Sequence, residues 1–135
     1  MKSGKFWLAV IAGGFVLNVL DFLLHGLILQ NAYYAKLTDV FNQGGSPAPF
    51  IIGDFVVAFV YAWVYDKVYG SFGGGLNGGS MFGLYAGVLT SFPTWLFMHL
   101  VIQGFPYDLA WIWTLNGIVW SVILGAVLGT IYKKK

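Results

Sequence analysis

Residues 17–26 read LNVLDFLLHG and place three polar side chains inside an apolar run that covers residues 6–30. A helix needs about 20 apolar residues to cross a bilayer at 1.5 Å of rise per residue, so this run predicts a transmembrane helix. At 100° per residue, Asn18, Asp21 and His25 fall on one narrow arc of that helix. A carboxylate near the middle of a membrane helix costs roughly 2.5–3.5 kcal/mol, so the arc must face protein or water.

The composition as a whole is that of a membrane protein. Of the 135 residues, 59% are apolar and 9% are charged, and the mean hydropathy is +0.77. We therefore expect one compact membrane domain over residues 1–135. The chain has no Cys, Arg or Glu. The absence of Cys excludes disulfides and thiolate metal sites, and the absence of guanidinium groups argues against nucleic acid as a partner.

Four apolar runs predict an all-α membrane protein, a four-transmembrane-helix bundle. The expected helices lie at about 6–30, 50–69, 81–103 and 107–131. Lys2 and Lys5 precede the first helix, which lacks a short apolar region followed by a cleavage site, so we expect an uncleaved signal anchor. Pro93 is expected to kink the third helix.

Two connecting segments have distinctive compositions. In residues 31–48, apolar side chains from Tyr33 to Phe41 recur at helical spacing, which predicts a short amphipathic helix on the outer interface. Residues 70–79 are rich in glycine but lack the Gly-Lys-Ser/Thr motif and the preceding strand of a phosphate-binding loop. We expect them to form a flexible connector between two helices.

Small residues recur at every fourth position of the last two predicted helices. The third helix carries Gly79, Gly83, Gly87 and Ser91, and the fourth carries Gly117, Ser121, Gly125 and Gly129. Such ladders let helix backbones approach closely in a membrane, where lipid provides no hydrophobic driving force between helices. They predict helix packing, either within one chain or between two copies.

The two halves of the chain are related by an internal repeat. A shift of 74 residues superposes His25 on His99 and Gly13 on Gly87. Residues 54–67 align in a similar way with residues 121–134. This pattern predicts two repeated helical hairpins, related by an axis along the membrane normal.

A cluster of polar side chains is expected in the outer half of the bundle. Its members are Asn18, Asp21, His25, Asp54, His99 and Asn116. At 1.5 Å per residue the two histidines lie roughly 12 Å outward of their helix centres, and the aspartates and Asn116 lie roughly 6–8 Å outward. Because each group would be costly to insert alone, we expect the two carboxylates and the two histidines to face one another.

Several chemistries fit such a cluster. It can be structural, with hydrogen bonds between helices and no cofactor, or it can pass protons or ions between Asp and His side chains. His25, His99, Asp21 and Asp54 are donors that suit a divalent metal, and His25 and His99 alone could ligate a b-type haem. We expect no catalytic residues, because no serine has an evident base partner in its local sequence.

The segment at residues 19–26, VLDFLLHG, and the Tyr33–Leu37 segment resemble small four-span bacterial membrane proteins of unknown function. Asp54, the glycine-rich turn and residues 117–132 fit the same outline, so the resemblance spans most of the chain. The sequence departs from that pattern at Trp120, near which such proteins often carry an acidic residue. The resemblance implies a fold and a bacterial inner membrane, and it implies no activity.

These observations lead to two functional expectations. The first is an accessory or assembly component of an inner-membrane complex, in contact with the lipid bilayer and with other membrane subunits or a second copy of the chain. The alternative is a proton-coupled ion or small-molecule binding or transport protein, or a b-haem or metal-binding protein, that uses the polar cluster. An enzyme is the least supported class.

The lysines predict the orientation in the membrane. Six of the seven lie on the side of the termini, and Lys36 alone lies on the other side. By the positive-inside rule both termini are expected to be cytoplasmic.

A single cysteine appended after Lys135 tests this orientation, and labelling is specific because the chain has no other cysteine. We expect a membrane-impermeant maleimide to modify it only after the cells are lysed. The matched control, Thr38→Cys in the opposite connector, should react in intact cells. The reverse pattern would contradict the predicted orientation.

Overall fold

The computed structural model describes residues 3–133, and this part of the chain is helical, without strands. Four spans are long and apolar enough to cross a membrane, at residues 4–36, 48–68, 75–101 and 107–131. The first consists of α1 (Gly4–Asp21), a π-helix η1 (Phe22–Ile28), α2 (Leu29–Ala32) and a 3₁₀ turn η2 (Tyr34–Lys36). The others are α3 (Ala48–Val68), α4 (Gly75–Trp95) with α5 (Met98–Val101), and α6 (Tyr107–Ile131). The predicted all-α, four-helix architecture is confirmed.

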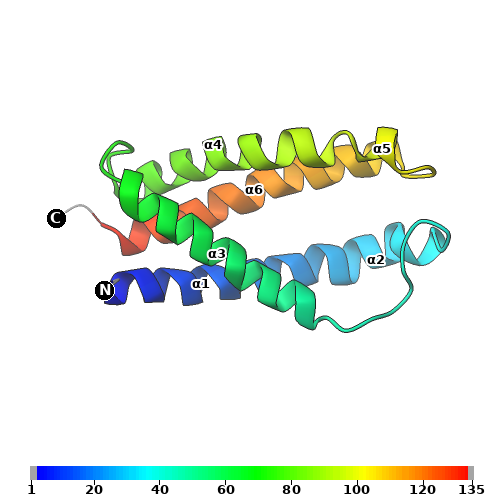
Figure 1. Cartoon of the computed structure of the whole chain (residues 1–135), viewed down its shortest axis with the longest axis horizontal. Helices are drawn as coiled ribbons and strands as arrows, with labels where there is room; N and C mark the ends of the chain where they lie inside the picture. The colour runs from blue at the N-terminus through cyan, green and yellow to red at the C-terminus, as the bar shows by residue number, and fades with distance from the viewer. Residues whose placement is uncertain (1–2, 134–135) are drawn as a thin grey trace.

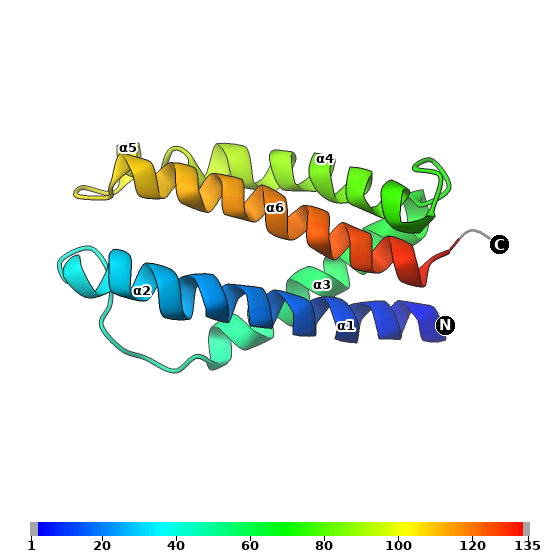
Figure 2. The ribbon, with the colours of Figure 1, turned by 180° about the vertical axis from the view of Figure 1, so that it is seen from behind.

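The helices form two hairpins, α1–α3 and α4–α6 (Figures 1 and 2). Helices α4 and α6 run side by side along their whole length, whereas α3 crosses α1 obliquely. Helix α1 also contacts α6, which joins the two hairpins. Both ends of the described chain lie at the same end of the bundle, as four spans require (Figure 1).

The two ladders of small residues face each other within one chain, between α4 and α6. A Cβ added at Gly83 would collide with the backbone oxygen of Ser121, and one added at Gly125 would collide with that of Gly79. At Gly87 the added atom would lie 2.7 Å from the Ser121 Cβ. The two backbones are therefore in direct contact, and no larger side chain fits between them.

The predicted flexible connector at residues 70–79 is shorter than expected, because α4 already begins at Gly75. Gly78 and Gly79 are buried, and a Cβ added at Gly79 would meet the backbone of Gly125. Glycine has a low helix propensity, but here close packing against α6 outweighs it. The first helix is also longer than its predicted range of 6–30, since its helical backbone runs from Gly4 to Ala32.

The predicted amphipathic helix at residues 31–48 is wrong beyond its first turns. After Ala32 only the 3₁₀ turn η2 is regular, and residues 37–47 form no helix. Tyr33, Val40 and Phe41 pack against a buried group of apolar residues instead of lying along the interface. Their helical spacing therefore reflects side chains that fold back onto the bundle.

The apolar core is split into two clusters. The larger lies toward the termini and includes Phe6, Ala9, Val10, Leu17, Ala58, Ala62, Tyr65, Phe82, Leu124, Leu128 and Tyr132. The smaller lies at the opposite end and consists of Leu29, Phe105, Leu109 and Ala110. The described charged side chains lie at the two ends of the molecule, except for Asp21 and Asp54, which lie between the clusters. Lys2, Lys134 and Lys135, on which the predicted orientation partly rests, lie outside the described residues.

Replacing Gly87 or Gly125 with Leu should destabilise the protein, because the new side chain must push α4 and α6 apart. We expect a loss of about 1–3 kcal/mol in the free energy of unfolding in detergent, as for overpacked cores. Gly53→Leu is the matched control, because a Cβ at Gly53 has no atom within 4 Å and glycine is a poor helix former. Equal stability of all three variants would contradict the close contact.

Candidate functional site

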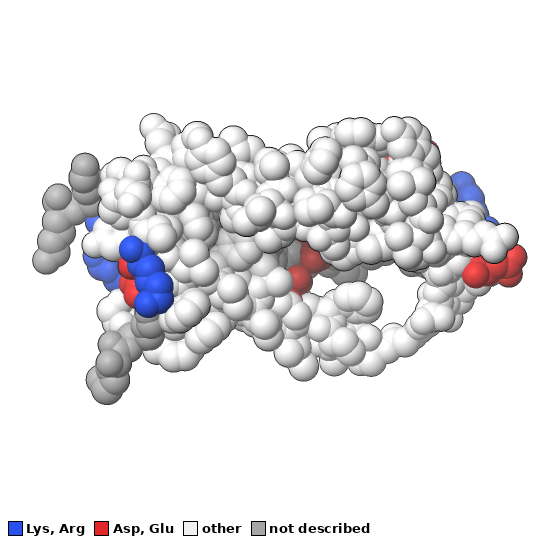
Figure 3. All heavy atoms as spheres, turned by 45° about the horizontal axis from the view of Figure 1, so that its top comes forward, with Lys and Arg blue, Asp and Glu red and all other residues white. Residues whose placement is uncertain are grey.

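A cavity of about 1380 Å³ lies between the two core clusters. It arises because the helices of the first hairpin differ in length. The first span has 33 residues and α3 has 21, a difference of about 18 Å at 1.5 Å per residue. Residues 37–41 form a hydrogen-bonded turn, and residues 42–47 cross the resulting gap without helix. Figure 3 shows the hollow beneath this segment with acidic atoms near its edge.

A π-helical segment shapes one wall of this cavity. The backbone N–H of Leu29 donates to the oxygen of Leu24, five residues earlier, where an α-helix would use the fourth. This wider turn changes the register after Asp21, and His25 and Gln30 both line the cavity. Insertions of this kind occur frequently at functional sites.

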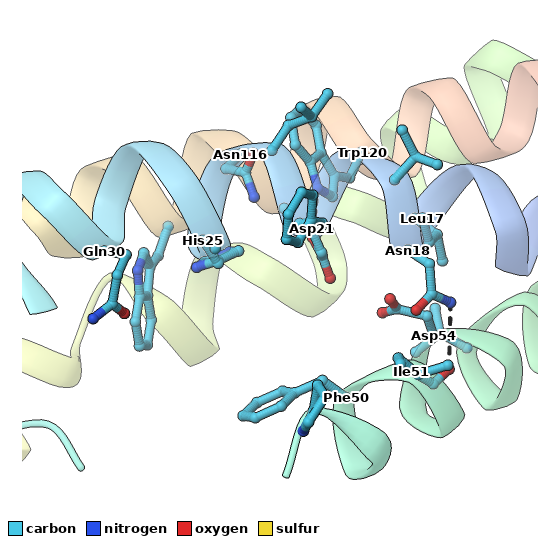
Figure 4. A pocket seen from close by; sticks show the side chains of 18 of the residues that line it. Leu17, Asn18, Asp21, His25, Gln30, Phe50, Ile51, Asp54, Asn116 and Trp120 are labelled. Atoms are coloured by element: carbon cyan, nitrogen blue, oxygen red, sulfur yellow. Dashed lines mark hydrogen bonds between the residues drawn. The ribbon is translucent and has the colours of Figure 1, made fainter. Parts of the chain in front are cut away.

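Asp21 and Asp54 approach each other across the cavity from different helices. Their carboxyl groups point toward one another (Figure 4) and lie within hydrogen-bonding reach. The indole N–H of Trp120, on α6, donates to Oδ1 of Asp21 over 2.6 Å. Both aspartates belong to the first hairpin. Asp21 is held in place by Trp120 of the second hairpin, whereas Asp54 faces the cavity.

Asn18 holds the two helices that carry these carboxyl groups. Its Nδ2 donates to the backbone oxygen of Gly14 over 2.9 Å and to that of Ile51 over 3.3 Å (Figure 4). Next to it, a Cβ added at Gly14 would collide with the ring of Phe55. The α1–α3 contact is therefore tight one turn before the cavity, which fixes the separation of the two aspartates.

His25 belongs to a chain of hydrogen bonds that links the first hairpin to α6. Trp113 Nε1 donates to the Tyr34 oxygen over 2.9 Å, and that oxygen lies 2.6 Å from His25 Nδ1. Because the phenol accepts from Trp113, its own hydrogen is available for Nδ1, which places the imidazole proton on Nε2. His25 then offers an N–H donor to a molecule in the cavity.

The prediction that His99 joins the cluster is wrong. Its Nδ1 donates to the backbone oxygen of Leu96 over 2.6 Å, because a carbonyl oxygen can only accept. Its ring packs edge-on against Tyr107 at 4.8 Å, and it does not line the cavity. The helix is interrupted after Trp95, two residues beyond Pro93, and His99 binds a carbonyl freed by this break.

The position of His99 affects the haem and metal hypotheses. The cavity contains one histidine, so the two-histidine arrangement that both hypotheses require is not formed there. Within residues 3–133, no group of three or more Asp or His side chains is placed to hold a metal ion. The predicted set of His25, His99, Asp21 and Asp54 is therefore not brought together.

The rest of the predicted polar cluster does come together. Asn18, Asp21, His25, Asp54 and Asn116 all line the same cavity. Three further residues line the cavity that the sequence did not predict as site residues, namely Tyr34, Trp113 and Trp120. Each carries an O–H or N–H on an apolar ring, and such groups find polar partners when they are buried.

No protein-family model matches this chain, and no curated protein and no solved structure matches it either. The resemblance to small four-span bacterial membrane proteins stays a prediction.

The cavity presents several polar side chains that can form hydrogen bonds with a ligand. Two carboxyl groups, an imidazole and four amides offer acceptors and donors on several sides of a hollow. Three serines line the cavity. Ser121 shares a hydrogen bond of 2.9 Å with Tyr61, Ser46 accepts from the backbone N–H of Ala48, and Ser91 and Ser121 lie against the glycine ladder. No hydrogen bond among the described residues joins any of these serines to a His or Asp side chain, so the lining favours ligand binding over nucleophilic catalysis.

Replacing Asp21 tests its bond with Trp120. Asp21→Leu should cost about 1–3 kcal/mol of stability, because the indole N–H loses its acceptor inside the bundle. Asp21→Asn, which keeps Oδ1, should leave stability nearly unchanged. Thermal unfolding in detergent measures both.

A double-mutant cycle with Trp120→Phe separates this bond from lost packing. If the hydrogen bond stabilises the fold, Asp21→Leu should lower the free energy of unfolding less in the Trp120→Phe background than in the wild-type background. Additive effects would show that the hydrogen bond does not stabilise the fold.

Proposed function

We propose that this chain is a multi-pass membrane protein that binds a small molecule in the cavity between its two core clusters. The proposal rests on one observation: Asp21 of α1, His25 of η1 and Asp54 of α3 all line the same large hollow. The volume of about 1380 Å³ exceeds the roughly 300–1,000 Å³ of typical small-molecule sites, so the cavity is large enough to hold such a ligand.

A purely structural role for the polar side chains explains less. Interhelical hydrogen bonds need direct contact, and protein interiors normally close around such groups at high packing density. The bond between Asp21 and Trp120 fits this description. Asp54, His25 and Asn116 instead border open volume, which an unoccupied structural cluster would not require.

The small-residue ladders give no support to an assembly role, because they contact each other within the chain. A role as an accessory component, with other subunits or a second copy as partners, remains a prediction that rests on the sequence alone.

The lysine distribution supports an orientation with both termini in the cytoplasm. A location in a bacterial inner membrane rests on the resemblance to small four-span bacterial membrane proteins. In this orientation residues 37–47, which border the cavity, lie on the outer side. The proposed ligand would then be taken from outside the cell or from the outer leaflet.

Cysteine accessibility tests whether the cavity admits molecules from water. In the natural cysteine-free background, Asn116→Cys places a thiol in the cavity lining. We expect small water-soluble methanethiosulfonates to modify it in detergent-solubilised protein, because these reagents need a hydrated thiolate. Leu115→Cys, one residue away on the lipid-facing side of α6 with 55% exposure, should react far more slowly.

If the Asn116→Cys thiol resists every reagent, including the uncharged methyl compound, the cavity is closed and the proposal fails. Native mass spectrometry of the wild-type protein extends the test, since a ligand bound in the membrane should be retained as an added mass. That mass should be absent when Asn116→Trp fills the cavity.

A further inference from the structure

The charge balance of the cavity restricts its ligand, provided that the binding role proposed above is correct. Two aspartates line it, no lysine does, and the chain has no arginine. His25 is neutral in the hydrogen-bond arrangement described above. The two carboxyl groups then carry two negative charges when both are ionised and one negative charge when they share a proton. An uncompensated charge at this depth is costly, and a cation offsets it.

The second feature is the aromatic lining. Trp95, Trp113 and Trp120 border the cavity from the second hairpin, and Phe22, Tyr34 and Phe50 border it from the first. Phe50, which is 78% exposed, extends from the start of α3 below Asp21 and His25 (Figure 4). Aromatic faces attract organic cations, especially quaternary or protonated amines, and they also accommodate an apolar body.

An inorganic ion fits this arrangement poorly. A bare cation such as Ca²⁺ needs six to eight oxygen ligands at about 2.3–2.6 Å, and the cavity offers two carboxylates and a few amides around a far larger volume. An anion would meet two carboxyl groups and no cationic residue other than a protonated His25. A neutral sugar would find hydrogen-bonding partners in the lining, but it would leave the negative charge of the carboxyl groups uncompensated.

We infer that the cavity binds an organic cation, an amine or quaternary ammonium group carried on an apolar or aromatic body. The cationic centre lies between Asp21 and Asp54, the two carboxyl groups that face each other. The apolar body lies against the aromatic side chains of η1, α3 and α6. Trp120 holds Asp21 in place for this contact through its indole N–H.

The Asn116→Cys variant measures this preference directly. Its rate of modification by the trimethylammonium-ethyl reagent is compared with that by the sulfonatoethyl reagent of similar size, each divided by the rate with free 2-mercaptoethanol. We expect the cationic reagent to be favoured by about tenfold or more, the factor that 1.4 kcal/mol provides. Adding Asp54→Asn should reduce the preference, whereas Asp54→Glu should preserve it.

Protection of the thiol by a bulky organic ion tests both the apolar part and the charge of the proposed ligand. Tetraphenylphosphonium and tetraphenylborate have nearly the same shape and opposite charges. We expect tetraphenylphosphonium to protect the Asn116→Cys thiol from the uncharged methyl reagent and tetraphenylborate to give no protection. Asp54→Asn should weaken the protection, and if this variant does not fold, the comparison of the two ions carries the test.

The outcomes separate the two proposals. A thiol that reacts equally with both charged reagents and is protected by neither ion overturns the organic-cation inference and leaves the binding cavity standing. Protection by tetraphenylborate alone overturns it too. A thiol that reacts with no reagent overturns both.

Discussion

The direct backbone contact between α4 and α6 determines how the rest of the chain packs. Because glycine and serine occupy every fourth position on both helices, these two backbones meet without intervening side chains. The pair presents a continuous surface to α1, which packs through large side chains such as Phe6 and Leu17. The first hairpin has no comparable ladder, and its helices cross obliquely instead of running in parallel.

The cavity follows from this difference between the hairpins. Helix α3 crosses α1 near Gly14 and Asn18 and is too short to accompany the first span to its end. Residues 37–47 then replace a helical wall with a thin segment whose side chains are exposed from Asn42 onward. The same geometry explains why Asp21 and Asp54 are tolerated. Asp21 lies just beyond the crossing, Asp54 lies at it between Ile51 and Phe55, and both line the open volume.

Several residues of this site could be predicted from the sequence, and others could not. Asn18 and Asp21 lie on one arc of a regular α-helix, so helical periodicity predicted their common direction. His25 faces the same cavity although it lies in the π-helix, which periodicity does not reveal. The bonds made by Tyr34 and Trp113 join positions 79 residues apart, so no local pattern contains them. The start of α4 was misjudged because packing against α6 outweighed the low helix propensity of Gly78 and Gly79.

The two histidines show how a repeat can lose functional symmetry. Helix α1 ends at Asp21 and α4 ends at Trp95, and these positions are 74 residues apart, the shift that superposes His25 on His99. Both spans are thus interrupted at the same point, but in different ways. In the first half the chain continues as a π-helix and turns His25 toward the cavity. In the second half the helix stops near Pro93, and His99 bonds to the carbonyl of Leu96 that the break exposes. Because α6 packs closely along α4, His99 stays at the end of this helix pair and does not reach the cavity that His25 lines.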